Sequence, residues 1–300
     1  NLTILVYILS NNMASYYVEK LHTDGVIILK NVFSADLADK VVNDFQEWSS
    51  VKENNFTPGQ RERVTNFHTF STNTKNLATN ECVKELLDTF FTKESVIYSS
   101  LFFREGTSQH FHRDTPHFYT NPMDLYCGVW YALEDIDQNA GPLKYYPKSH
   151  QLSVPNGIET YNRLLSNNTD NFKDKEYSKQ NFDCLMEYNK ILEDECERTG
   201  LQACDETNYL NNKIEKGDVI IWHPKLVHGG SMVIDTSLTR YSMVTHNIPI
   251  NTQVFNAEHF FRKTPSHDYI FNDCEYTYNQ HNNVNYVKFD AGPKVQLKYI

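Results

Sequence analysis

The feature of this sequence that most restricts its fold is a succession of five segments in which apolar and polar residues tend to alternate. The segments are rich in β-branched and aromatic residues, and residues that favour turns separate them. A period of two is typical of strands in a sheet, so the central part of the chain is predicted to be built from sheets. The segments are Val96 to Arg104, Tyr126 to Leu133, Leu143 to Tyr146, Asp218 to His223 and Arg240 to Asn247.

The part of the chain before these segments has a helical pattern. Ser34 and Asn80 are residue types that cap helices, and each precedes apolar residues spaced three or four apart, as in a helix that packs on one side. Helices followed by strands predict an α+β protein with a mainly β core, arranged as a sandwich or barrel of the jelly-roll type. The two apolar stripes are Leu37, Val41, Phe45 and Trp48, and Val83, Leu86, Leu87, Phe90 and Phe91.

The run from Glu134 to Pro142 consists mostly of turn-forming residues. Short connections of this kind commonly join antiparallel strands. We therefore expect the strands on either side of this run to pair with each other.

No internal repeat and no linker rich in Pro, Gly or Ser divides the chain, so we expect one domain over residues 13–300, with Met13 as a candidate start. Residues 151–212 hold 12 acidic and 6 basic residues, a net charge of −6, and are expected to form a helical insertion. If the insertion folds over the mouth of a site, its charge would favour a neutral or cationic substrate. The expected parts are a helical N-terminal part (13–94), a β core (about 95–150 and 213–250), the insertion (151–212) and a C-terminal segment that wraps the core (251–300).

Composition narrows the class of protein. An aromatic content of 13% in 300 residues excludes a disordered chain and permits a sizeable core. The net charge of −10 disfavours nucleic acid and anionic membranes as partners, and leaves a small molecule as the expected one. The apolar run Leu2 to Leu9 is too short to cross a bilayer and lacks a cleavage site, so the cytoplasm is the expected location. The oligomeric state has no signature in the sequence.

The chemistry of the chain is indicated by His112 and Asp114. On an extended strand, residues two apart project from the same face, so both side chains can reach one metal ion. His228 follows a predicted strand and can supply a second imidazole. Two imidazoles and one carboxylate on one side of an ion form the facial triad of non-haem Fe(II) oxygenases, which leaves positions open for other ligands.

Arg240, twelve residues after His228, adds to the specificity of this pattern. Its guanidinium could hold the far carboxylate of a 2-oxo dicarboxylic acid by a bidentate pair while the oxo acid end chelates iron. A lone His-x-Asp pair would carry little weight, because most such pairs in proteins bind no metal. The pair together with His228 and Arg240 carries much more.

Around these residues the sequence resembles the phytanoyl-CoA dioxygenase family of Fe(II)- and 2-oxoglutarate-dependent oxygenases. The resemblance covers Ser95 to Gln151 and Ile214 to Pro249, and the order and spacing of the motifs agree as well as the residue types. The motifs are His112-Arg113-Asp114, Pro116-His117-Phe118, Val129 to Ile136, Asn139 to Leu143, Tyr146 to His150, Lys216-Gly217-Asp218, His223-Pro224, His228-Gly229 and Arg240.

The resemblance implies a double-stranded β-helix, a jelly-roll and cupin-like fold, with His112, Asp114 and His228 as ligands of Fe(II). It implies Arg240 as the anchor of the distal carboxylate of 2-oxoglutarate, and Trp130 as a residue that lines the co-substrate pocket. The implied reaction consumes O2, converts 2-oxoglutarate to succinate and CO2, and hydroxylates a small-molecule or lipid-like substrate, with ascorbate as a candidate reductant. Related halogenases replace the carboxylate ligand by a small residue, whereas this chain retains Asp114.

Two other functions stay open at this point. The first is a catalytically silent barrel that binds a ligand without turnover, for which loss of a ligand residue or of Arg240 would be expected. The second is a zinc-dependent hydrolase that uses the same three residues and a bound water, which would leave Arg240 without a role. The identity of the substrate, including whether it is a CoA thioester, does not follow from the sequence.

Overall fold

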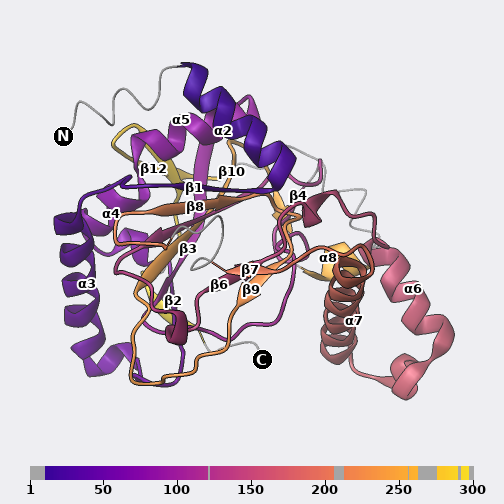
Figure 1. The fold of residues 1–300 in the computed structure, drawn as a ribbon. Coiled ribbons are helices and arrows are strands. Elements are labelled where there is room, and N and C mark those ends of the chain that lie inside the picture. The colour runs from indigo at the N-terminus through magenta and orange to yellow at the C-terminus, as the bar shows by residue number, and fades with distance from the viewer. Residues whose placement is uncertain are drawn as a thin grey trace.

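The computed structural model describes residues 11–120, 122–205, 213–255, 257–262, 276–289 and 292–296. Within these residues the helices divide into an N-terminal group and a group from the insertion and the segment after the last core strand (Figure 1). The N-terminal group is α2 (Asn11–Asp24), α3 (Ala35–Ser50), α4 (Thr72–Ala78) and α5 (Glu81–Phe91), and the second group is α6 (Gly157–Asn167), α7 (Tyr177–Arg198) and α8 (Ala257–Phe261).

The largest sheet has nine strands in the described part of the chain, and its main path runs β1-β8-β5-β10-β3-β13-β12. All its pairs are antiparallel except β13 with β3, and β2 and β14 extend it beside β3. The strands are β1 (Val26–Leu29), β2 (Arg63–Thr65), β3 (Ser95–Phe103), β5 (Cys127–Ala132), β8 (Val219–Trp222), β10 (Ser242–Pro249), β12 (Tyr278–His281), β13 (Val284–Val287) and β14 (Lys294–Gln296).

A smaller sheet has the order β7-β6-β9, and β4 pairs with β11 separately. Successive core strands alternate between the two larger sheets: β5 lies in the large one, β6 in the small one, β8 in the large one and β9 in the small one. This alternation brings residues at the ends of distant segments to the space between the sheets. The remaining strands are β4 (Tyr119–Thr120), β6 (Leu143–Tyr145), β7 (Cys204–Asp205), β9 (His228–Gly230) and β11 (Val254–Phe255).

The core lies on both faces of the large sheet, because successive strand residues point to opposite faces. Val129 and Tyr131 pack on the N-terminal helices, where Phe102 stacks on Phe45 of α3 with ring centroids 4.4 Å apart. Trp130, between Val129 and Tyr131, packs on the opposite face with residues of the small sheet. Strands buried on both faces read as nearly continuous apolar runs, as β5 does.

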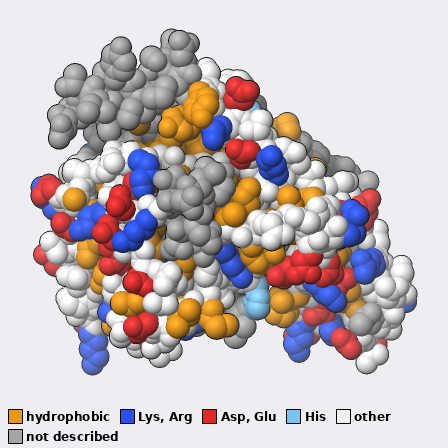
Figure 2. Space-filling view, in the orientation of Figure 1, with side chains coloured by type: hydrophobic (Ala, Val, Ile, Leu, Met, Phe, Trp, Pro, Cys, Tyr) orange, Lys and Arg blue, Asp and Glu red, His pale blue; other side chains and the backbone are white. Residues whose placement is uncertain are grey.

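The insertion packs as a unit at one side of the sheets. Helices α6 and α7 lie together with α8 beside them (Figure 1), and their shared core includes Phe172, Tyr188, Phe260 and Phe261. Acidic side chains gather among basic ones over the outer face of α7 (Figure 2). The helical character expected for residues 151–212 is confirmed in the residues described, because α6 and α7 both lie within this range.

The five predicted strands and the two predicted N-terminal helices are present, with ends within two residues of those expected. Ser34 and Asn80 each accept a hydrogen bond from a backbone N–H in the first turn of their helix, as caps. β1 and β2 were not predicted, and they are short strands within the part expected to be helical. Both add to the large sheet through pairing with β8 and β3.

The expected pairing across Glu134 to Pro142 is wrong. The strand before this run, β5, pairs with β8 and β10, whereas the strand after it, β6, pairs with β7 and β9. The run contains a 3-10 turn capped by Asp137 and a left-handed Gly141, and Ile136 N–H donates to the carbonyl of Ile214. These bonds anchor the run away from a hairpin, so it carries the chain from one sheet to the other.

The division into one domain with the parts given above stays a prediction. The run Leu2 to Leu9 lies outside the described residues. No helix among the residues described is long and apolar enough to span a bilayer.

Candidate metal centre

The backbone holds His112 and His228 side by side. His112 N–H donates to the carbonyl of His228 and His228 N–H donates to the carbonyl of His112, each at 2.9 Å. This reciprocal pair joins the segment after β3 to β9, and places the two imidazole centroids 4.4 Å apart. Only His112 of its segment makes such a bridge, so the extended strand expected there is reduced to a single pair, and Asp114 lies at the start of a turn.

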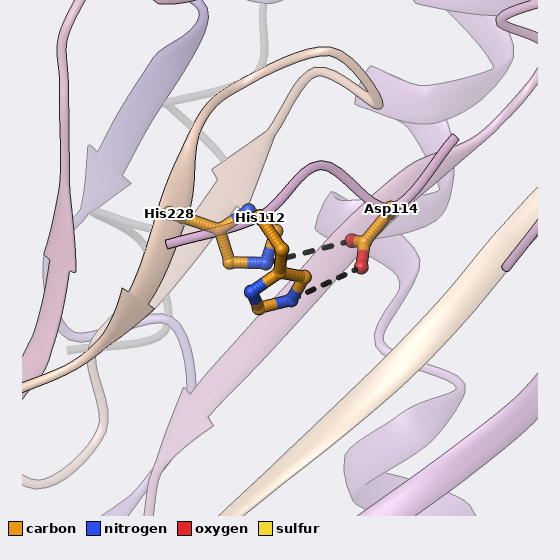
Figure 3. A group of neighbouring side chains, drawn as sticks. All are labelled: His112, Asp114 and His228. Carbon is orange, nitrogen blue, oxygen red and sulfur yellow. Dashed lines mark ion pairs between the residues drawn. The ribbon is translucent and has the colours of Figure 1, made fainter. Parts of the chain in front are cut away.

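Both imidazoles are oriented by a backbone carbonyl. His112 Nδ1 lies 2.9 Å from the carbonyl oxygen of His110, and His228 Nδ1 lies 3.0 Å from that of Leu226. A ring nitrogen that faces a carbonyl must carry the proton, so the lone pair of each ring is on Nε2. These two Nε2 atoms face the carboxylate of Asp114, at 3.8 Å from Oδ1 for His112 and 3.7 Å from Oδ2 for His228 (Figure 3).

The carboxylate of Asp114 is held by two aromatic side chains. Trp222 Nε1 donates to Oδ2 at 2.8 Å and the Tyr126 hydroxyl donates to the same oxygen at 3.0 Å. Partners of this kind fix the orientation of a ligating group before a metal arrives. Trp222 and Tyr126 were not predicted as site residues, although a buried Trp or Tyr usually has a hydrogen-bond partner.

Gly128 makes room for one of these partners. It lies opposite Trp222 in the pairing of β5 with β8. A Cβ built on Gly128 would come 2.2 Å from atoms of the Trp222 indole, a distance at which something must move. The absence of a side chain at Gly128 therefore allows the indole to reach Asp114.

Burial and neighbouring charges set the protonation of the group. The pKa of His112 is lowered to about 3, mainly by burial and next by the neighbouring His228. Asp114 acts in the opposite direction, but its effect is smaller. Burial alone would raise the pKa of Asp114, but His228, His112 and His246 hold it below its usual value. A neutral imidazole and an ionised carboxylate are the forms that bind a metal.

The donor set fits a divalent metal ion. One ligand atom from each of the three residues lies within 4.8 Å of the other two, and each residue is at most 7% exposed. The Gln109 amide nitrogen lies 3.2 Å from His112 Nε2, so a metal at this nitrogen would take the place of that contact. His110, two residues before His112, is exposed, and its carbonyl is the partner of His112 Nδ1.

The three residues open into a cavity of about 550 Å³, a volume within the usual range of ligand sites. Arg240 and Trp130 line the same cavity and are 3% and 1% exposed. The Arg240 guanidinium donates to the carbonyl of Gly141 at 3.0 Å and lies 5.9 Å from the Trp130 ring. The structure thus brings together all five residues that the sequence analysis singled out.

Solved structures of similar fold include enzymes that depend on or bind alpha ketoglutarate (2-oxoglutarate). The non-heme alpha ketoglutarate dependent carbocyclase SnoK from nogalamycin biosynthesis is 14% identical, with a TM-score of 0.60 over 82% of this chain and 88% of that one. The epimerase SnoN, in complex with Fe3+, alpha ketoglutarate and nogalamycin RO, is also 14% identical, with a TM-score of 0.60 over 85% and 91%. EctD from S. alaskensis, with 2-oxoglutarate and 5-hydroxyectoine, is 15% identical, with a TM-score of 0.56 over 82% and 78%.

The sequence itself matches one family model. A comparison with curated proteins finds no match. The model of the phytanoyl-CoA dioxygenase family matches residues 21–234, which include His112, Asp114 and His228 and end before Arg240. Because the match spans more than half of the chain, this protein belongs to the phytanoyl-CoA dioxygenase family.

Proposed function

We propose that this protein is an Fe(II)- and 2-oxoglutarate-dependent dioxygenase that hydroxylates a small-molecule or lipid-like substrate. The observation that carries the proposal is the convergence of two buried imidazoles and one buried carboxylate in a cavity that also contains a buried guanidinium. Family membership and the fold shared with 2-oxoglutarate-dependent enzymes support an oxygenase. The alternation of core strands between two sheets supports a double-stranded β-helix.

Iron fits the donor set that these residues offer. His112, Asp114 and His228 would hold the ion from one side, and this set of two imidazoles and a carboxylate is the one used by non-haem Fe(II) oxygenases. When bound, iron and 2-oxoglutarate supply the oxidising power for the reaction with O2, with succinate and CO2 as the products of 2-oxoglutarate. The residues of this chain contribute the fixed orientation of the three ligands, whose side chains are buried.

Arg240 and Trp130 would hold the co-substrate. A buried guanidinium binds a carboxylate in two parallel hydrogen bonds, and the low exposure of Arg240 strengthens such a pair. Trp130 Nε1 is buried and makes no hydrogen bond within the described residues. Its indole would give the pocket an apolar wall and one spare donor.

Hydroxylation is the part of the proposal that needs the most direct test. The solved structures of similar fold include a carbocyclase and an epimerase, so the fold alone does not determine the outcome of the reaction. Asp114 would supply the carboxylate ligand, and its side chain is held by Trp222 and Tyr126. The retained carboxylate supports oxygen transfer over halide transfer. A zinc hydrolase with the same three residues would leave Arg240 without a role.

The test is an anaerobic titration of the metal-free protein with Fe(II) and then with 2-oxoglutarate. Bidentate chelation at open iron positions is expected to give a weak visible absorption band near roughly 500 nm. The band should be absent in His112→Ala and retained in His110→Ala, which changes an exposed histidine two residues away. Iron binding without the band in the wild type would contradict the proposal and favour the zinc or silent-barrel function.

A further inference from the structure

Helix α7 of the insertion forms part of the cavity wall. Cys184, Tyr188 and Leu192 are buried in the core that α7 shares with its neighbouring helices. The adjacent face, one position further along, presents Leu185 and Asn189 to the cavity, together with Met186. Residues 185 and 189 are four apart, so they lie above one another on the same side of the helix.

The insertion does not bring its negative charge to this wall. Its acidic side chains are absent from the described lining of the cavity, where Asp114 is the only carboxylate and Arg63 and Arg240 are cations. The acidic side chains of the insertion therefore make no direct contact with a ligand in this cavity, within the residues described. What α7 offers instead is two apolar side chains and one neutral amide.

Two amides that line the cavity have a polar atom without a partner. Oδ1 of Asn189 and Oδ1 of Asn66 are buried and make no hydrogen bond within the described residues. Asn66 belongs to a different segment, directly after β2, and its backbone N–H donates a hydrogen bond to the carbonyl of Ser100. Nearly all buried polar atoms in native proteins are hydrogen-bonded, so an oxygen without a partner on a side chain that lines a cavity is a candidate for bonding to a ligand.

We propose that Asn189 and Asn66 accept hydrogen bonds from donor groups of the substrate, and that the substrate joins hydroxyl groups to an apolar body. The apolar body would lie against Leu185 and Met186. This inference deepens the proposed function and rests on it, since it concerns the molecule oxidised at the metal centre. It assigns substrate selection to the insertion and to the segment after β2, apart from the residues that would hold iron and 2-oxoglutarate.

The experiment compares probes that differ only in their donors. Octane-1,2-diol and 4-phenylbutane-1,2-diol are each paired with their dimethyl ether, which keeps the apolar body and removes both O–H groups. Dissociation constants are measured by calorimetry on the anaerobic protein with Fe(II) and 2-oxoglutarate added. The proteins are the wild type, Asn189→Leu, Asn66→Leu and the control Asn181→Leu. Asn181 also lies on α7 with a buried Oδ1 that has no partner, but it does not line the cavity.

We expect the wild type and Asn181→Leu to bind at least one diol about tenfold or more tightly than its ether. The preference should disappear in Asn189→Leu and fall in Asn66→Leu. Equal binding of diols and ethers by the wild type, an unchanged preference in Asn189→Leu, or failure of both diols to bind would each overturn the inference.

The absorption band of bound 2-oxoglutarate is recorded in the same samples, which separates this inference from the proposed function. A normal band without a diol preference would overturn the inference alone. If the protein prefers diols through Asn189 but shows no band, the proposed function is overturned and the inferred substrate-binding site still stands. A normal band in Asn189→Leu also shows that a lost preference is not a folding defect.

Discussion

The metal centre and the wall formed by α7 differ in how completely their polar atoms are paired. At the metal centre, Nδ1 of each histidine and Oδ2 of Asp114 already have partners, and these fix both rings with Nε2 turned toward the carboxylate. At the wall, Oδ1 of Asn189 has none within the described residues. The difference indicates that one region is organised in advance for its ligand, whereas the other is completed only when a ligand binds.

The two regions also differ in what holds them. The histidines are fixed by reciprocal backbone hydrogen bonds between two strand segments, and Asp114 by side chains from β8 and the start of β5. Asn189 is held by the packing of a helix whose core is separate from those of the sheets. Substitutions in the first region should therefore affect chemistry, and substitutions in the second should affect substrate preference.

The largest effect is expected for His112→Ala. Loss of one of three ligands should lower 2-oxoglutarate turnover, measured as succinate formed, by about 100-fold or more while the far-ultraviolet circular dichroism stays unchanged. His110→Ala, the matched control, should keep turnover within about twofold, since only its carbonyl contributes. Comparable losses in both variants would show that the neighbouring backbone, and not the imidazole of His112, is what matters.

Arg240→Ala should follow. Truncation of one side of a desolvated charge pair costs about 2 to 5 kcal/mol, so the affinity for 2-oxoglutarate should fall by about 30-fold or more. The measurement is a titration of the absorption band with 2-oxoglutarate. Arg63→Ala, which changes a second buried arginine of the same cavity, should leave this affinity nearly unchanged. An equal fall in both variants would contradict the assignment of the anchor to Arg240.

Trp222→Phe tests the advance organisation of the metal centre. The variant keeps an aromatic ring and removes the N–H that donates to Asp114, so the affinity for Fe(II) should fall about 10- to 100-fold. Tyr126→Phe removes the second donor to the same oxygen and should give a change of the same kind. If the affinity for Fe(II) is unchanged in both variants, the hydrogen bonds to Asp114 have no effect on metal binding. The metal centre would then not be organised in advance for its ligand.

The smallest effect is expected at the α7 wall. Met186 is 39% exposed, so Met186→Ala should change the free energy of unfolding by no more than about 0.5 kcal/mol. It should weaken binding of 4-phenylbutane-1,2-diol a few-fold, because it removes apolar area that faces the ligand. The affinity for 2-oxoglutarate, measured on the same sample, should not change. A fall in that affinity would mean that the two regions are coupled.

Much of the metal centre followed from the sequence because its motif is local. His112 and Asp114 are so close along the chain that any extended or turned backbone keeps their side chains near one another. The strands followed from their period of two, and the helices from their caps and stripes. The roles of Trp222 and Tyr126 did not follow, because a buried aromatic residue in a strand looks like core until the strands are paired.

Two expectations failed or were limited for physical reasons. The strands on either side of the turn-forming run from Glu134 to Pro142 do not pair with each other as expected, because turn residues do not specify which sheet the next strand joins. The net charge of the insertion was known, but charge summed over a segment does not tell which face of α7 turns toward the cavity. That face depends on the packing of Tyr188 and its neighbours, which is a tertiary property.

The bridge between His112 and His228 has a consequence for the flexibility of the chain. The two residues enclose the whole insertion, so an ion bound to both would close a long loop at its base. An ion that binds the folded and not the unfolded chain stabilises the folded state, and it raises the free energy needed to separate the two segments locally. The metal would then hold the two segments together at the base of the insertion. Its loss would loosen the sheet edge from which the insertion departs before it affects the rest of the protein.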